Sequence, residues 1–64
     1  MKLKQYYGKT ITVVDSNEQI FKGIVSDFFF AEDNESGTES IVLETEEGEL
    51  YEFTEENISR IIEK

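Results

Sequence analysis

The sequence contains no cysteine, no histidine and no proline. A disulfide is therefore excluded, and so is a zinc site built from thiolate or imidazole ligands. Catalysis also has little to use, because Ser and Thr hydroxyls have no evident base and no pattern places two carboxylates in contrasting environments. We expect a protein that is not an enzyme and that needs no cofactor. Without repeats or linker-like stretches, the 64 residues predict one domain over residues 1–64.

Long apolar runs are lacking as well. The first residues, Met1-Lys2-Leu3-Lys4-Gln5, lead into tyrosines and a glycine. No run approaches the roughly 18 apolar residues that a membrane span needs, and none is typical of a signal peptide. We therefore expect a cytoplasmic protein with no membrane partner.

Basic residues are scarce and unevenly placed. Six Lys and Arg stand against fifteen Asp and Glu, which gives a net charge of −9. Residues 1–22 carry four lysines and two acids, whereas residues 23–59 carry twelve acids and no base. Such a surface repels phosphate groups, so nucleic acid and anionic membranes are poor partners. The charge by itself would keep a small protein dispersed. An acidic face for a basic protein is the sharper interpretation.

What the sequence does have is a strand pattern, in which β-branched and aromatic residues alternate with polar ones. It predicts five strands, over residues 9–14, 19–30, 39–45, 49–53 and 58–62. Gly23 interrupts the second strand, which is typical of a bulge or a sharp bend. Turn chemistry separates the strands at residues 15–18 and at Gly48. Residues 3–7 predict a short helical turn, and residues 54–57 a turn capped by Thr54.

These elements predict a mainly β fold, a small and strongly bent five-stranded antiparallel barrel that is partly open, with a short helical turn at the N-terminus. Alternation along the strands predicts which side chains face inward. They are Ile11, Val13, Phe21, Val25, Phe28, Ile41, Leu43, Tyr51, Phe53, Ile58 and Ile61.

Residues 7–13 and 21–28 resemble the opening half of an Sm-like (LSM) domain. In that family an apolar residue, a spacer and a glycine lead through further apolar positions to an aromatic residue, and residues 21, 23, 25 and 28 match this spacing. The sequence is also similar to small acidic Sm-like proteins of Gram-positive bacteria. The resemblance implies a small SH3-like barrel that can assemble into a ring. A monomer, a dimer and a ring all remain open.

The resemblance does not extend to the residues with which Sm-like proteins bind RNA. The family has an Asp after the aromatic residue, an Asn four positions later and an Arg-Gly pair in its second motif. Here Phe29 replaces the Asp, Asp33 falls at the Asn position, and Arg60 is followed by Ile61. Asn34 would substitute for the Asn if the loop shifted by one residue. The alternative function is therefore an RNA-binding ring with a non-standard site made of Phe29, Asn34 and Arg60.

Three phenylalanines, residues 28–30, stand directly before an acidic loop. Alternation predicts that Phe28 and Phe30 face inward while Phe29 lies on the other face. We expect an interaction surface made by Phe29, Glu32, Asp33, Glu35 and Tyr51. The preferred function is a non-catalytic interaction module, an acidic Sm-like barrel that engages a basic protein partner or mimics nucleic acid.

Two other uses of these residues are weaker. Residues 32–39 echo the spacing of acids in an EF-hand loop, but the glycine comes one position early and the closing glutamate is missing, so we predict no metal site. Aromatic rings beside acids can also form a cage for a cationic ligand. Tyr6, Tyr7, Phe29 and Tyr51 are the candidates, although filling a core is the commoner role of such rings.

Overall fold

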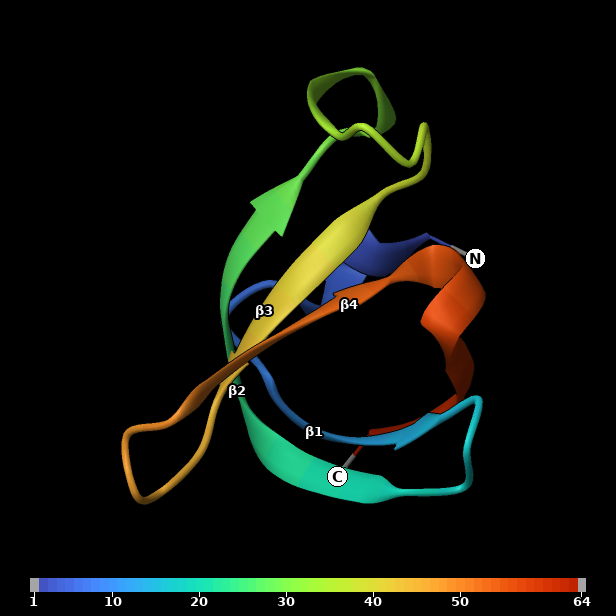
Figure 1. Cartoon of the computed structure of the whole chain (residues 1–64). Coiled ribbons are helices and arrows are strands. Elements are labelled where there is room, and N and C mark those ends of the chain that lie inside the picture. The colour runs from blue at the N-terminus through green and yellow to red at the C-terminus, as the bar shows by residue number, and fades with distance from the viewer. Residues whose placement is uncertain (1, 64) are drawn as a thin grey trace.

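The computed structural model describes residues 2–63, which form one curled antiparallel sheet (Figure 1). Its elements are η1 Leu3–Tyr6, β1 Thr10–Asp15, β2 Ile20–Phe29, η2 Ala31–Asp33, β3 Ser40–Glu44, β4 Leu50–Thr54, η3 Glu55–Asn57 and β5 Ile58–Glu63, where η marks a 3₁₀ turn. The strand order is β4-β3-β2-β1-β5. The predicted mainly β, bent and open architecture is confirmed. Within residues 2–63 no helix could cross a membrane.

The core lies on the inner face of the curled sheet. All eleven residues predicted to face inward belong to the buried cluster or pack against it. The ring of Phe21 lies with its centroid 4.9 Å from that of Tyr51 and 5.1 Å from that of Phe53, so three aromatic residues from two strands fill one end of the core. Fully burying a large apolar side chain contributes about 1.5–3 kcal/mol, so Phe53, at 6% exposure, contributes more than the half-buried Phe21 and Tyr51.

Two buried apolar residues, Leu3 and Val14, were not predicted by the alternation along the strands. Leu3 is fully buried because η1 folds against the sheet, where the Leu3 N–H donates to Glu39 Oε1 at 3.2 Å. Val14 lies on the outer face of β1, a strand with neighbours on both sides, between Ile20 of β2 and Arg60 of β5. Longer neighbours on the same face cover its short side chain, so it is only 2% exposed.

The sharp curvature of β2 in Figure 1 depends on Gly23. A Cβ at this position would lie 2.3 Å from the carbonyl oxygen of Glu44 and 3.2 Å from Cγ of Leu43, so only glycine lets β2 approach β3 this closely. The register irregularity itself comes slightly later, between Val25 and Asp27. The bend predicted at Gly23 is present, and its immediate cause is this close contact between two backbones.

The predicted turns are present. Asp15 Oδ1 accepts hydrogen bonds from the N–H groups of Asn17 and Gln19, at 2.9 and 2.8 Å. Gly48 takes the positive φ of +86° that the hairpin requires. Glu18 also takes a positive φ, of 66°, in a turn that has no glycine.

Two details of the prediction are wrong. Thr54 does not cap η3, because its side chain makes no capping hydrogen bond and its Oγ1 is buried without a partner among the described residues. Phe30 does not face the core with Phe28. It lies just beyond the end of β2 and is 46% exposed, with its ring edge-on to that of Phe28 at 5.0 Å. The alternation of inward and outward side chains therefore ends where β2 ends, at Phe29.

Replacing Gly23 with alanine tests the contact that allows the sheet to curl. We expect Gly23→Ala to lower the free energy of unfolding by about 2–3 kcal/mol, because the new methyl group must displace backbone. Urea denaturation measures the change. The matched control is Lys22→Ala on the exposed face of the same strand, which should cost less than about 0.5 kcal/mol. Equal stability of both variants would contradict the role given to Gly23.

Candidate interaction surface

The loop between β2 and β3 is organised by Asn34. Its Nδ2 donates to the carbonyl oxygen of Thr38 at 2.7 Å and to Ser40 Oγ at 3.0 Å. The fully buried Ser40 hydroxyl donates in turn to Glu52 Oε2 on β4, at 2.9 Å. The hydrogen-bonded series Asn34–Ser40–Glu52 therefore joins the loop to the outer face of β4. Nothing in the sequence indicated it, because the three residues come from separate elements.

The same loop lies beside η3, although about twenty residues separate them in the sequence. The Thr38 hydroxyl donates to Glu56 Oε1 at 3.2 Å, and the Glu55 N–H donates to the carbonyl oxygen of Glu39 at 2.9 Å. This arrangement gathers exposed carboxylates at one end of the molecule. We call this group the loop-end acids: Glu32, Asp33, Glu35, Glu52 and Glu56.

A shallow hollow opens among the loop-end acids. It is lined by Asp33, Asn34, Glu35, Ser36, Glu52 and Thr54. Its lining has no basic side chain, so it repels anions. The residues that make it come from the loop and from β4, which are held together through Ser40.

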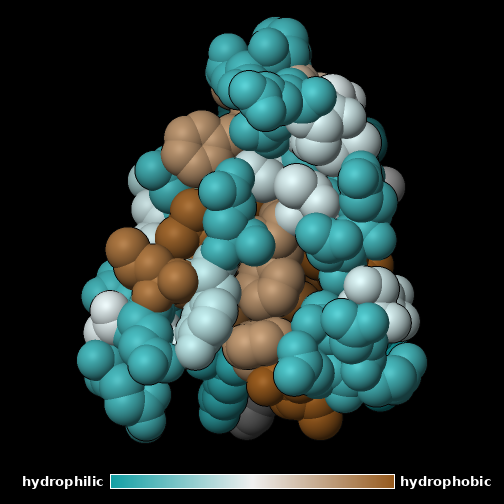
Figure 2. Space-filling model, viewed as in Figure 1, coloured by the Kyte–Doolittle hydropathy of each residue, from teal (hydrophilic) through white to brown (hydrophobic). Residues whose placement is uncertain are grey.

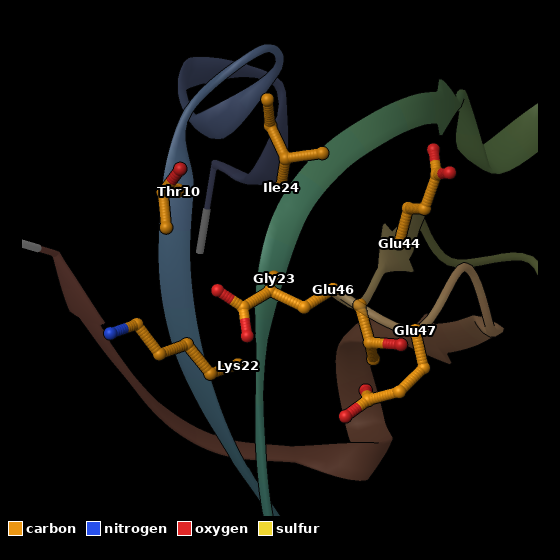
Figure 3. A pocket seen from close by; sticks show the side chains of 8 residues that line it. Thr10, Lys22, Gly23, Ile24, Glu44, Glu46 and Glu47 are labelled. Carbon is orange, nitrogen blue, oxygen red and sulfur yellow. The ribbon is translucent and has the colours of Figure 1, made fainter.

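A second acidic group lies at the other end of β4, around the hairpin that joins it to β3. These hairpin acids are Glu44, Glu46, Glu47 and Glu49, and all are exposed. Figure 3 shows a hollow here, lined by the hairpin and by Thr10, Lys22, Gly23 and Ile24. The Glu46 side chain extends from the hairpin toward β2. Figure 2 shows hydrophilic residues over the loop at the top and over the hairpin at the lower left, with apolar residues visible between them.

The structure brings together four of the five residues predicted for the interaction surface. Phe29 ends β2, opposite Ser40, and is half-buried on the outer face as predicted. Glu32, Asp33 and Glu35 follow it in the loop. Tyr51 is the exception.

Tyr51 lies near the hairpin end of β4 and on the inner face, opposite Leu43, with its ring against Phe21. It is separated from the loop by the length of the strand. The five predicted residues therefore lie in two places: four lie at or beside the β2–β3 loop, and Tyr51 packs against the core.

The three residues proposed for RNA binding do not form one site. Asn34 already uses its amide N–H groups within the loop. Arg60 pairs across β1 with Val14, which in turn pairs with Ile20 at the start of β2. Phe29 is at the opposite end of that ten-residue strand. Within one chain, Arg60 therefore lies on a different part of the sheet from Phe29 and Asn34.

The aromatic cage was the weaker interpretation, and its four candidate side chains do not come together in one place. Tyr6 and Tyr51 pack against the core. Tyr7 is 59% exposed, and the small hollow that it lines has one charge of each sign, Lys4 and Asp27, and none of the other three candidate rings. Lys4 Nζ already lies 5.2 Å from the ring centroid of Phe30. Within residues 2–63, no group of three His, Cys, Asp or Glu side chains could hold a metal ion.

The acidic hairpin shifts the pKa of Tyr51. Its hydroxyl donates to Glu49 Oε1 at 2.8 Å. That hydrogen bond and the negative charge of Glu49 raise the pKa of Tyr51 above its usual value of 10.0, because ionisation would break the bond and place two anions together.

Comparison with known proteins supports the fold. One solved chain, from the work on the "Structural basis of the Dcp1:Dcp2 mRNA decapping complex activation by Edc3 and Scd6", superposes with a TM-score of 0.70 and 16% sequence identity. The match covers 98% of this chain and 59% of that one, so the chain spans about three-fifths of its length. No protein-family model matches the sequence, and no curated protein matches it. At this identity the likeness shows a shared small β fold.

Removing the Asn34 side-chain amide tests whether its hydrogen bonds stabilise the loop. Asn34→Ala loses two hydrogen bonds in a half-buried site and leaves Ser40 without its donor, so we expect the free energy of unfolding to fall by about 1–2 kcal/mol. Thermal denaturation measures it. Glu35→Ala, the exposed neighbour, is the control and should change stability by less than about 0.5 kcal/mol. A fully stable Asn34→Ala variant would show that the loop needs no internal support.

The raised pKa of Tyr51 has a consequence at high pH. Because the folded pKa lies above the unfolded one, the Tyr51–Glu49 bond adds stability below the usual tyrosine pKa, and this stability is lost as pH rises through the folded value. Ultraviolet titration of the tyrosines should show one late transition, which disappears in Tyr51→Phe. Glu49→Gln should move that transition back toward the usual pKa. An unchanged titration in Glu49→Gln would refute the stated cause.

Proposed function

We propose that this domain is a non-catalytic cytoplasmic interaction module of the Sm-like type, whose acidic surface engages a basic segment of another protein. The observation that carries the proposal is the placement of the twelve acids between residues 23 and 59. All are exposed except Glu39 and Glu55, which are half-buried. Most of them lie at the two ends of β4, where Lys22 lies beside the hairpin acids.

The Sm-like assignment rests on several features together. A short N-terminal turn precedes five strands, the second strand bends sharply at a glycine, and a single 3₁₀ turn links β4 to β5. The solved chain with the same fold comes from work on a protein complex, which agrees with an interaction role. Function depends on the site rather than on the fold, so the acidic surface is the stronger argument.

A basic protein suits this surface better than RNA does. Phosphate binding needs Lys or Arg beside the ligand, and every charged residue of the β2–β3 loop is acidic. The separation of Arg60 from Phe29 and Asn34 within one chain also favours the basic protein. Complementary charge also speeds the encounter of two proteins, which makes such binding strongly dependent on salt.

Fluorescence anisotropy with defined probes tests this function. A labelled peptide of alternating lysine and valine should bind at low ionic strength and more weakly near physiological salt, while a serine–valine peptide should not bind. Glu52→Gln should weaken binding about two- to fivefold, the range of one exposed charge pair. Glu18→Gln, an equal charge change on the distant β1–β2 turn, should leave it unchanged. Labelled oligouridine or oligoadenosine should not bind at any salt concentration. Binding of these RNAs without binding of the basic peptide would overturn the proposal.

A further inference from the structure

The outer edge of β4 presents unpaired backbone groups at alternate residues. In an antiparallel pair, every second residue directs its N–H and C=O to the partner strand, and the residues between direct theirs away. On the β3 side, the Thr45 N–H donates to the Glu49 carbonyl and the Glu55 N–H donates to the Glu39 carbonyl. Positions 49, 51, 53 and 55 thus face β3 in the continuous register. The N–H and C=O groups of Leu50, Glu52 and Thr54 therefore point away from the sheet.

No strand within residues 2–63 covers these groups, because β4 ends the strand order on one side. An exposed edge of this kind can accept another strand. Leu50 is 65% exposed at its start, so the edge also offers apolar surface. β4 contains neither proline nor an inward-pointing charge, two of the devices that block pairing.

The charges around the edge of β4 indicate which kind of strand would bind there. The hairpin acids lie at one end of β4 and most of the loop-end acids at the other, while Glu52, itself a loop-end acid, projects from the outer face of the strand. The inner face of the same strand carries Tyr51 and Phe53, which belong to the aromatic cluster around Phe21. A strand laid beside β4 would meet acids on one face and aromatic rings on the other.

We propose that the edge of β4 binds an extended segment of another protein as a sixth strand, with basic and apolar residues alternating along that segment. The basic side chains would lie on the outer face near Glu52, and the apolar ones would extend the aromatic cluster on the inner face. Its backbone would pair with Leu50, Glu52 and Thr54. This inference rests on the proposed function, because it specifies how the acidic surface holds its basic partner.

A second copy of this chain fits the edge less well. Its own free edge, β5, carries one basic residue, Arg60, and its Glu63 is already paired with Lys9 Nζ at 2.7 Å, so it brings little positive charge to the acids beside β4. Each copy would also bring a net charge of −9. Like charges in close contact oppose association, whereas a basic segment neutralises them.

Hydrogen exchange followed by NMR tests the pairing directly. With a saturating peptide of alternating lysine and valine, the amides of Leu50, Glu52 and Thr54 should exchange at least about tenfold more slowly, because each becomes hydrogen-bonded. The amides of Tyr51 and Phe53 already bond to β3 and should change little. A peptide of the same sequence that is N-methylated on the backbone at every residue has the same charge but no backbone N–H group to donate. It should bind more weakly and protect none of the three.

These two peptides separate failure of the inference from failure of the proposed function. If both bind equally and neither protects β4, the surface attracts basic proteins but strand addition is wrong. If neither binds, the proposed function fails as well. If the three amides are already protected without peptide and the protein sediments as an oligomer, a second copy occupies the edge and the inference is overturned.

Substitution at the central edge position provides the matched control. Glu52→Ala and Glu52→Pro both remove the carboxylate and its bond to Ser40, but only proline also removes the outward N–H. Glu52→Pro should bind the lysine–valine peptide about five- to tenfold more weakly than Glu52→Ala does. If Glu52→Pro does not fold, Leu50→Pro and Leu50→Ala make the same comparison at the end of the strand with every acid retained. Equal affinity within the folded pair would contradict strand addition.

Discussion

The close contact between the Gly23 backbone and the Glu44 carbonyl is the constraint on which the rest of this structure depends. Because β2 has no side chain at that point, it can bend over β3 and carry its two halves into different parts of the sheet. The curl encloses a core that is large enough for a chain of 64 residues without a disulfide. It also leaves β4 and β5 as separate edges, unlike the strands of a closed barrel.

The charge distribution follows from the same geometry. A core this small has no room for carboxylates, so the acids lie at the strand ends and on the outer face, where solvent screens them. The series Asn34–Ser40–Glu52 holds the acidic loop against β4, so the loop-end acids keep a fixed position relative to that strand. The edge of β4 thus lies between two acidic groups, of which the loop group is held against the strand. This arrangement, more than the net charge, supports a role in binding a basic segment.

Strand positions, turns and the inward residues could be predicted from the sequence, because alternation and turn chemistry are local properties. The errors came where distant residues decide. Leu3 is buried because η1 packs against the sheet. The Thr54 hydroxyl is buried and does not cap η3. Phe30 lies outside the core because β2 ends before it. Tyr51 and Arg60 were grouped with the loop by residue type, and only the register shows that they lie elsewhere. The edge pairing of β4 likewise depends on strand order, which no local pattern reveals.

The most direct measurement of the central claim is a set of intermolecular nuclear Overhauser effects between isotope-labelled protein and an unlabelled peptide of alternating lysine and valine. Cross-strand contacts from peptide backbone protons to Leu50, Glu52 and Thr54, with valine methyl groups near Tyr51, are the predicted result. Contacts confined to lysine side chains and the loop-end acids, with none to the β4 backbone, would contradict it.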